Sequence, residues 1–298
     1  MDIIEEILNS PLLLDAPPVL LDIGASGEIH QKWQKIAKYS IGIAFDADDR
    51  DFGYAVNESK GYRKLYVFNS LVTNGATAEA NFYLTRSPYC SSLLEPDHES
   101  LGRYNFGDLF EVDRIVRLKT VQLTNALREI GVNKVDWFKT DSQGTDLRLF
   151  ASLGEEMTNR ILVAEFEPGI IDGYKGEDKL FSLMSFMGGQ PFWMNDIRIC
   201  GTQRISKEAT FELSARKMQP NMHVRISPCW AEVSYFNSFG LNAHYLDLRD
   251  FLLGWVFALI EGQYGFALDV ALQAKQRFKD PVFETLTQYA ADLISRNV

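Results

Sequence analysis

The stretch Asp22-Ile23-Gly24-Ala25-Ser26-Gly27 constrains the fold most, because it follows a short apolar run at 19–21 and precedes a helical pattern. Two glycines three positions apart let the chain turn tightly and let a ligand approach where a Cβ atom would collide. A strand, a glycine turn and a helix in this order predict the first unit of a doubly wound α/β sheet with a nucleotide-like ligand at the turn.

The turn differs from the fingerprint of dinucleotide-binding proteins. It is one glycine short of G-x-G-x-x-G, and Glu28 stands where the helix should begin. Since helix N-termini attract anions, an acidic residue there disfavours a pyrophosphate. S-adenosylmethionine carries an amino group and a sulfonium but no phosphate, so this turn with the Asp22 carboxylate predicts S-adenosylmethionine rather than a nicotinamide dinucleotide.

A second acidic residue arrives at the spacing that such a fold requires. Residues 41–45 are an apolar run that ends in Asp46, 22 positions after Gly24. In doubly wound sheets an acid about 20 residues past the glycine turn binds the ribose hydroxyls. Between the two strands, Trp33 and Ile36 belong to an amphipathic pattern that predicts a helix over 29–39.

Composition limits the classes of partner. A chain of 298 residues with 46% apolar residues can bury one α/β core and an accessory element. The net charge of −10 and the absence of a Lys/Arg block argue against nucleic acid. The three cysteines lack metal-site spacing, the first ten residues do not resemble a signal peptide, and the longest apolar run, 251–260, is about half of a membrane span. We therefore expect a soluble cytoplasmic protein without a membrane span.

Further apolar runs extend the α/β pattern. Strands are predicted at 65–68, 81–85, 135–140 and 161–164, helices around 123–130 and 180–187, and a hairpin turn at 195–196. Because open α/β sheets bind ligands beyond the carboxyl ends of their strands, Asp22, Asp46, Asp141 and Glu165 should converge there.

The character of the sequence changes near residue 230 to a mainly helical tail. Helices are predicted at 247–263, at 266–278 and from Asp280-Pro281 to 294, with Asp as N-cap and Pro at the first helical position. The predicted division is a sheet domain at 1–229 and a helical extension at 230–298. We expect the extension to dock on the sheet domain or on a second copy of the chain, which makes a homo-oligomer one of the expected states.

Four motifs together resemble the FkbM family of S-adenosylmethionine-dependent methyltransferases over roughly residues 18 to 205. They are Leu21-Asp22-Ile23-Gly24-Ala25-Ser26-Gly27, Phe45-Asp46-Ala47-Asp48, Ser91-Ser92-Leu93-Leu94 and Val135-Asp136-Trp137-Phe138-Lys139-Thr140-Asp141-Ser142-Gln143-Gly144. The resemblance implies a class I methyltransferase (Rossmann-like) sheet of seven mostly parallel strands with the last antiparallel and helices on both faces. It also implies methylation of a hydroxyl oxygen on a small, carbohydrate, glycolipid or polyketide-derived acceptor. One departure is that family members often have Asn-x-Gly after the first glycine, where this chain has Ala25-Ser26-Gly27.

The resemblance also implies roles for residues of this chain. Gly24 and Gly27 would line the methionine part of the cofactor, Asp22 would face its amino group, Asp46 would hold the ribose, and 69–71 would lie near the adenine. The complete expected cofactor set is Asp22, Gly24, Ala25, Gly27, Asp46, Ala47, Ser70, Leu71, Asp141 and Ser142.

Methyl transfer to an alcohol benefits from a base that removes the hydroxyl proton. Asp141 is the first candidate because it ends the central strand, and His98 in the neighbouring loop is the alternative. Glu165 would orient the acceptor hydroxyl or hold a divalent cation with Asp141, although no metal site is predicted from spacing. The expected acceptor-binding residues are Ser91, Ser92, Lys139 and Gln143, and Lys139 is also expected to pair with a carboxylate near the site.

Three classes of function fit the sequence. The first is an O-methyltransferase that uses S-adenosylmethionine. The second is a nicotinamide-dependent oxidoreductase, which the missing glycine and Glu28 disfavour. The third is a non-catalytic binding or assembly protein that uses the helical tail as its interaction surface.

Overall fold

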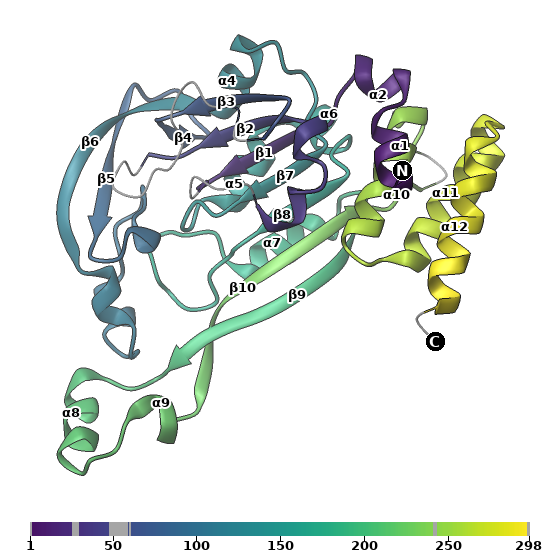
Figure 1. Ribbon diagram of the computed structural model, residues 1–298. Helices are drawn as coiled ribbons and strands as arrows, with labels where there is room; N and C mark the ends of the chain where they lie inside the picture. Colours follow the sequence, from purple (N-terminus) through teal and green to yellow (C-terminus); the bar gives the residue numbers. More distant parts are fainter. Residues whose placement is uncertain (1, 26–29, 48–58, 60, 241–242, 297–298) are drawn as a thin grey trace.

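The protein is an α/β structure built on a seven-stranded sheet, seen here in a computed structural model that describes residues 2–25, 30–47, 59, 61–240 and 243–296 (Figure 1). The strands lie in the order β3-β2-β1-β7-β8-β10-β9. The first five are parallel, and β10 runs antiparallel to both of its neighbours. The prediction of seven mostly parallel strands with the last antiparallel is confirmed. The strands are β1 (Val19–Ile23), β2 (Ile41–Phe45), β3 (Lys64–Phe68), β7 (Trp137–Thr140), β8 (Val163–Phe166), β9 (Phe192–Gln203) and β10 (Ile226–Asn237).

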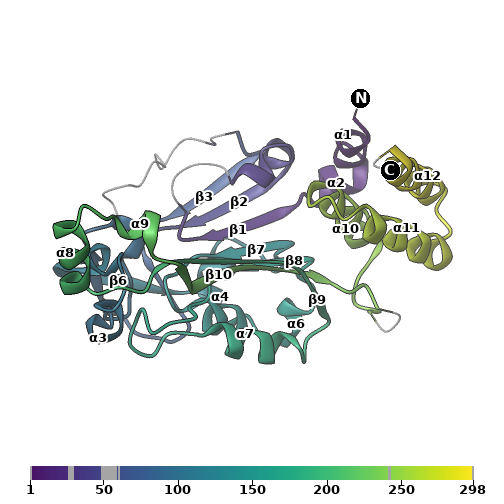
Figure 2. The same cartoon turned by 90° about the horizontal axis from the view of Figure 1, so that it is seen from below.

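A layer of helices covers one face of the sheet. Parallel strands covered on both faces are continuously apolar, and all five residues of β1 are buried. On this face Phe138 packs against Phe150, and Leu183 belongs to the same core. Figure 2 shows helices of this layer below the sheet. The layer contains α4 (Leu123–Glu129), α5 (Asp146–Ser152), α6 (Glu155–Thr158) and α7 (Leu180–Met187).

The two ends of the chain pack against the opposite face over the starts of its parallel strands (Figure 2). Trp137 of β7 contacts Trp33 and Phe257, with ring centroids 5.9 and 4.9 Å away. The C-terminal helices therefore share one core with the sheet and dock on it, as one of the two expected alternatives proposed. The elements are α1 (Ile3–Leu8), α2 (Pro11–Asp15), α10 (Leu248–Ile260), α11 (Tyr264–Phe278) and α12 (Val282–Arg296).

The helix predicted over 29–39 is wrong. Trp33, Ile36 and Ala37 are buried as the pattern requires, but they belong to the segment of two 3-10 helices, η1 (Gln31–Trp33) and η2 (Ala37–Tyr39). Ile29 lies outside the described residues. Because α10 already covers this face of the sheet, short turns suffice to bury these side chains, and tertiary packing overrides the local periodicity.

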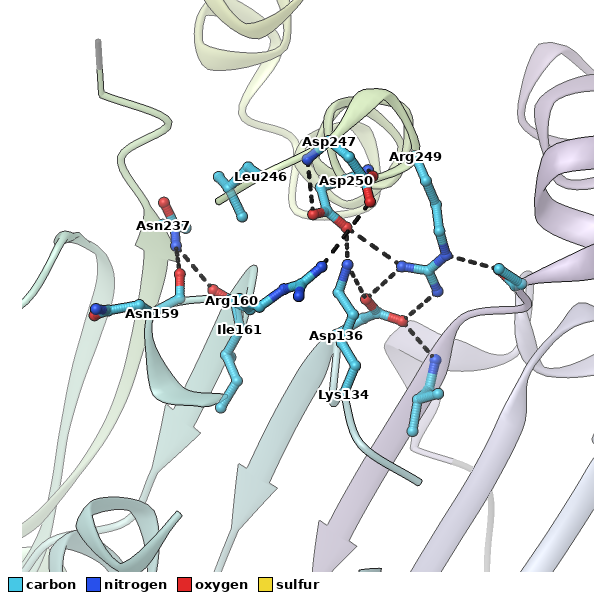
Figure 3. A network of polar contacts seen from close by, with 12 residues as sticks. Lys134, Asp136, Asn159, Arg160, Ile161, Asn237, Leu246, Asp247, Arg249 and Asp250 are labelled. Atoms are coloured by element: carbon cyan, nitrogen blue, oxygen red, sulfur yellow. Dashed lines mark hydrogen bonds and ion pairs between the residues drawn. The ribbon is translucent and has the colours of Figure 1, made fainter. Parts of the chain in front are cut away.

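A buried ion pair fastens the helical extension to the sheet (Figure 3). Arg249 of α10 donates from Nη1 and Nη2 to both carboxylate oxygens of Asp136 at 2.8 and 2.7 Å, directly before β7. Lys134 and Asp250 form a second pair beside it. The boundary expected at 229/230 falls inside β10, so the sheet continues to Asn237 and the helical extension begins at Leu248.

A second, three-stranded sheet stands beside the carboxyl ends of the main sheet. It consists of β4 (Leu71–Thr73), β6 (Val112–Gln122) and β5 (Glu79–Thr85). The strand predicted at 81–85 is part of β5. The central strand, β6, was not predicted, although its apolar and charged residues alternate. The connection between β5 and β6 contains the short elements η3 (Pro88–Cys90), α3 (His98–Leu101) and η4 (Gly107–Phe110).

The β9–β10 hairpin extends away from the body of the molecule (Figure 1) and carries α8 (Lys207–Ala215) and α9 (Pro220–His223) at its tip. The turn predicted at 195–196 is wrong, because both residues lie within β9. Asn195 instead donates from Nδ2 to Ser234 Oγ at 2.9 Å across the strand pair. Pairing with β10 over eleven positions keeps this segment extended despite its turn-forming residues. Within the described residues, no helix is long and apolar enough to cross a membrane.

Candidate functional site

A pocket opens where β1, β2 and β7 end, and we call it the strand-end pocket. Its walls come from these strand ends, from the start of β4 and from the loop after β5. The residues predicted for the site that line it are Gly24, Asp46, Ala47, Ser70, Leu71, Ser91, Asp141, Ser142 and Gln143. The structure thus brings together residues that are up to 119 positions apart in a chain of 298 residues.

Gly24 allows the ends of β1 and β7 to come together. Its φ of +79° is a conformation that side chains disfavour, and a Cβ atom there would lie 2.1 Å from the carbonyl oxygen of Asp141. Asp141 in turn donates its N–H to Ile23 O at 2.8 Å. Gly24 is therefore required for the geometry of this pocket, because it makes room for the backbone of Asp141.

The lining of the strand-end pocket combines the aspartates Asp46 and Asp141 with an apolar wall. Asp46 follows β2 directly, next to Phe45, while Leu71 and Phe82 from the second sheet face the same space. None of the lining residues that the structure describes is Lys, Arg or His. A ribose and an uncharged aromatic base fit such a lining, whereas a pyrophosphate finds no cation there.

One residue predicted for the cofactor occupies another position, and a second lies outside the described residues. Ala25 is buried and packs against Ala44 instead of facing the pocket. Gly27 lies outside the described residues, as does Glu28. The next described helical element after the turn is the short η1, so no α-helix N-terminus points at the pocket from the described part of this segment.

Asp22 is paired within the sheet. Its carboxylate accepts a hydrogen bond from Lys139 Nζ at 2.9 Å, and its side chain is nearly buried. Burial opposes the charge of Lys139, but the carboxylates of Asp22 and Asp141 outweigh it and raise the pKa of Lys139. The expected pairing of Lys139 with a carboxylate is confirmed. The partner is the same Asp22 that was expected to face the cofactor amino group, so Asp22 lies behind the pocket wall.

Asp141 has the environment of a general base. It lines both the strand-end pocket and an adjoining acidic cleft, and its carboxylate accepts a hydrogen bond from Gln143 Nε2. Burial raises the pKa of Asp141 to about 6, with a further contribution from Asp146. Asp146 itself is fixed, since it accepts hydrogen bonds from the N–H groups of Ser142 and Glu167 at 2.9 and 2.8 Å. A carboxylate with a pKa near neutrality can hold a proton during turnover.

The other two catalytic candidates are placed less favourably. Glu165 lines the acidic cleft, where it accepts from Trp137 Nε1 at 2.7 Å and pairs with Lys32 at 3.3 Å. Its carboxylate therefore connects the sheet to η1. His98 is exposed at the first position of α3 and does not line the strand-end pocket as far as the structure describes it.

The two serines of the motif at 91–94 have different environments. Ser92 donates from Oγ to Gln143 O at 2.7 Å and accepts from Leu94 N at 3.0 Å, so it supports the loop that carries Gln143. Ser91 lines the strand-end pocket. Acceptor binding by Ser92 is therefore less favoured than by Ser91.

Glu167 is a residue that sequence reasoning missed. Burial raises its pKa to about 9, with further contributions from Asp141 and Asp146. It lines the acidic cleft and also a third pocket on the far side of Gln143. The available signal was its position two residues after Glu165, just past the end of β8, where ligand-binding residues concentrate.

No cluster of three or more His, Cys, Asp or Glu side chains suited to a metal ion occurs among the described residues. No protein-family model, no curated protein and no solved structure matches this chain.

Proposed function

We propose that this protein is an S-adenosylmethionine-dependent methyltransferase of the FkbM type that methylates a hydroxyl oxygen. The observation that carries the proposal is the lining of the strand-end pocket. Gly24, Asp46 and Leu71 meet there beside Asp141, with no cationic residue among the described lining. The seven-stranded sheet with an antiparallel last strand agrees with the architecture that the family resemblance implies.

The residues of the pocket suit the parts of the cofactor. Asp46 would accept hydrogen bonds from the two ribose hydroxyls, and Leu71 with Phe82 would contact the adenine. Gly24 and Ser142 would line the methionine part, since they lie at the same strand ends as Asp141. When bound, S-adenosylmethionine supplies an electrophilic methyl group on a sulfonium.

Asp141 would act on the acceptor. Its carboxylate would take the proton of the acceptor hydroxyl as the hydroxyl oxygen bonds to the methyl group. With a pKa raised to about 6, this carboxylate is ionised at neutral pH and is a stronger base than an ordinary aspartate. Gln143 fixes the orientation of this carboxylate through its Nε2. Lys139, paired with Asp22, keeps a positive charge beside Asp141 and favours its ionised form.

The acceptor class named by the resemblance, a small or carbohydrate hydroxyl compound, remains part of the proposal. So does a cytoplasmic location, which the three free cysteines support. The nicotinamide alternative is disfavoured because none of the described lining residues is Lys, Arg or His, whereas a dinucleotide brings two phosphates.

Calorimetry tests the proposal directly. S-adenosylhomocysteine should bind and NAD should not. Asp46→Ala should weaken S-adenosylhomocysteine binding by about 2 to 4 kcal/mol through the loss of two charge-assisted hydrogen bonds. Asp196→Ala, on β9 and outside the strand-end pocket, is the matched control. NAD binding without S-adenosylhomocysteine binding would overturn the proposal, and an unchanged affinity in Asp46→Ala would remove the ribose role.

A further inference from the structure

A third pocket adjoins the strand-end pocket, and we call it the aromatic pocket. The two share Tyr89 and Gln143 in their linings. The main aromatic lining residues are Tyr89, Phe106, Phe110, Tyr174 and Trp230. A compound seated in the aromatic pocket would therefore lie next to the groups that would act on the acceptor.

The aromatic side chains form a continuous wall. Trp230 of β10 stacks on Phe106, with ring centroids 6.1 Å apart and planes 12° from parallel. Phe106 meets Phe110 edge-on at 5.2 Å, and Phe110 meets Tyr174 at 5.6 Å. Such a wall offers ring faces and edges to a flat apolar group.

Most polar groups of the aromatic pocket are already engaged. Glu177 accepts hydrogen bonds from Gly173 N at 2.6 Å and from Tyr174 N at 3.3 Å, and it pairs with Lys179 at 2.6 Å. Tyr174 donates from its hydroxyl to Gln143 Oε1 at 2.8 Å. These contacts stabilise the pocket and leave these groups little capacity for a charged ligand.

Glu167 differs from these groups. No hydrogen bond or ion pair to its carboxyl group is found among the described residues, and this carboxyl lies where the aromatic pocket meets the acidic cleft. Asp141 lines that same cleft. A protonated carboxyl group can donate one hydrogen bond and accept another without adding charge, and burial holds the Glu167 pKa at about 9.

We propose that the aromatic pocket is the acceptor site, that it takes an uncharged alcohol carrying a flat apolar ring, and that Glu167 hydrogen-bonds the hydroxyl of this alcohol. The inference rests on the proposed function for its chemistry, but the binding site itself does not depend on it. An acceptor with a carboxylate would be excluded, because a second acid would enter a mostly apolar site beside Glu167, and none of the described residues that line this pocket is Lys or Arg.

The test uses two probes that share a naphthalene ring and differ only in its substituent, 2-naphthalenemethanol with a CH2OH group and 2-naphthoate with a carboxylate. Both are titrated by calorimetry into the full chain with S-adenosylhomocysteine present and absent. We expect 2-naphthalenemethanol to bind about tenfold or more tightly than 2-naphthoate at pH 7.5. Trp230→Leu should weaken 2-naphthalenemethanol binding roughly tenfold. Trp193→Leu, whose ring packs on Phe266 outside this pocket, is the matched control and should leave binding unchanged.

Two variants isolate the carboxyl group. Glu167→Gln keeps a neutral hydrogen-bonding group and should bind 2-naphthalenemethanol within about threefold of the natural chain, whereas Glu167→Leu should weaken it about tenfold. Equal affinity for the two probes, or equal loss in Trp230→Leu and Trp193→Leu, would overturn the inference. S-adenosylhomocysteine binding without probe binding would defeat the acceptor site alone, and probe binding without S-adenosylhomocysteine binding would defeat the proposed function alone.

Discussion

The ion pair between Arg249 and Asp136 gives the sharpest prediction about stability. Both side chains are buried, and Asp136 is fully enclosed. Arg249 donates to both carboxylate oxygens and also to the carbonyl oxygens of Ala16 and Pro17, at 2.7 and 2.8 Å (Figure 3 shows the carboxylate contacts). Although burial opposes its charge, Arg249 holds the pKa of Asp136 below the ordinary value. The change to test is Arg249→Met, which keeps the length of the side chain but removes the guanidinium.

The expected loss follows from what remains around Asp136. Its nearest partners in the variant would be Val19 N at 2.8 Å and Lys134 at 3.9 Å, which already pairs with Asp250. The buried carboxylate can escape its charge by taking a proton, which at pH 7 costs a group of pKa about 3.9 roughly 4 kcal/mol. This cost is the upper limit of the charge penalty in the variant, and it lies within the range of about 3 to 5 kcal/mol for breaking a buried ion pair.

The sign of the pH dependence distinguishes this explanation from a simple loss of packing. In the variant the folded-state pKa of Asp136 rises above its unfolded value, so the penalty is absent below about pH 3.9 and grows as pH increases. Between pH 7 and pH 5 the loss should shrink by about 2.5 kcal/mol.

Urea unfolding followed by circular dichroism at pH 5 and pH 7 measures both quantities. Arg198→Met is the matched control, because Arg198 pairs with Glu232 on the exposed part of the hairpin and its replacement should change the unfolding midpoint little. In the double variant Arg249→Met with Asp136→Asn, the loss of stability should no longer depend on pH between 5 and 7. An equal loss of stability at the two pH values would refute the reasoning.

Three further predictions concern the site. Asp141→Asn should slow turnover by about 10² to 10⁴ while S-adenosylhomocysteine affinity changes little, and full activity would exclude it as the base. In the natural chain kcat/KM should rise with pH and level off above about 6 as Asp141 loses its proton, so a flat profile from pH 5 to 8 would contradict this assignment. Gly24→Ala should weaken S-adenosylhomocysteine binding by roughly tenfold, because the new Cβ would lie 2.1 Å from Asp141 O at a strained φ; calorimetry showing unchanged affinity would contradict it.

The sequence by itself predicted the central parallel strands of the main sheet and the residues at their ends. Apolar runs predicted β1, β2 and β8, because parallel strands are buried on both faces, and β7 was predicted from a stretch that also contains Asp136 and Lys139. The glycine turn at Gly24 and the acids Asp46 and Asp141 were found for the same reason, since their positions are local consequences of where the strands end. The helix at 180–187 was predicted with its observed bounds.

The tertiary structure decided everything that depends on which surfaces meet. It replaced the helix expected over 29–39 with short turns because α10 covers that face of the sheet, and it kept 195–196 extended because β10 pairs with it. It paired Asp22 with Lys139 and left Glu167 without such a partner among the described residues. Local spacing specifies hydrogen bonding and periodicity along one segment, whereas burial and charge pairing depend on side chains contributed by segments more than 100 residues away.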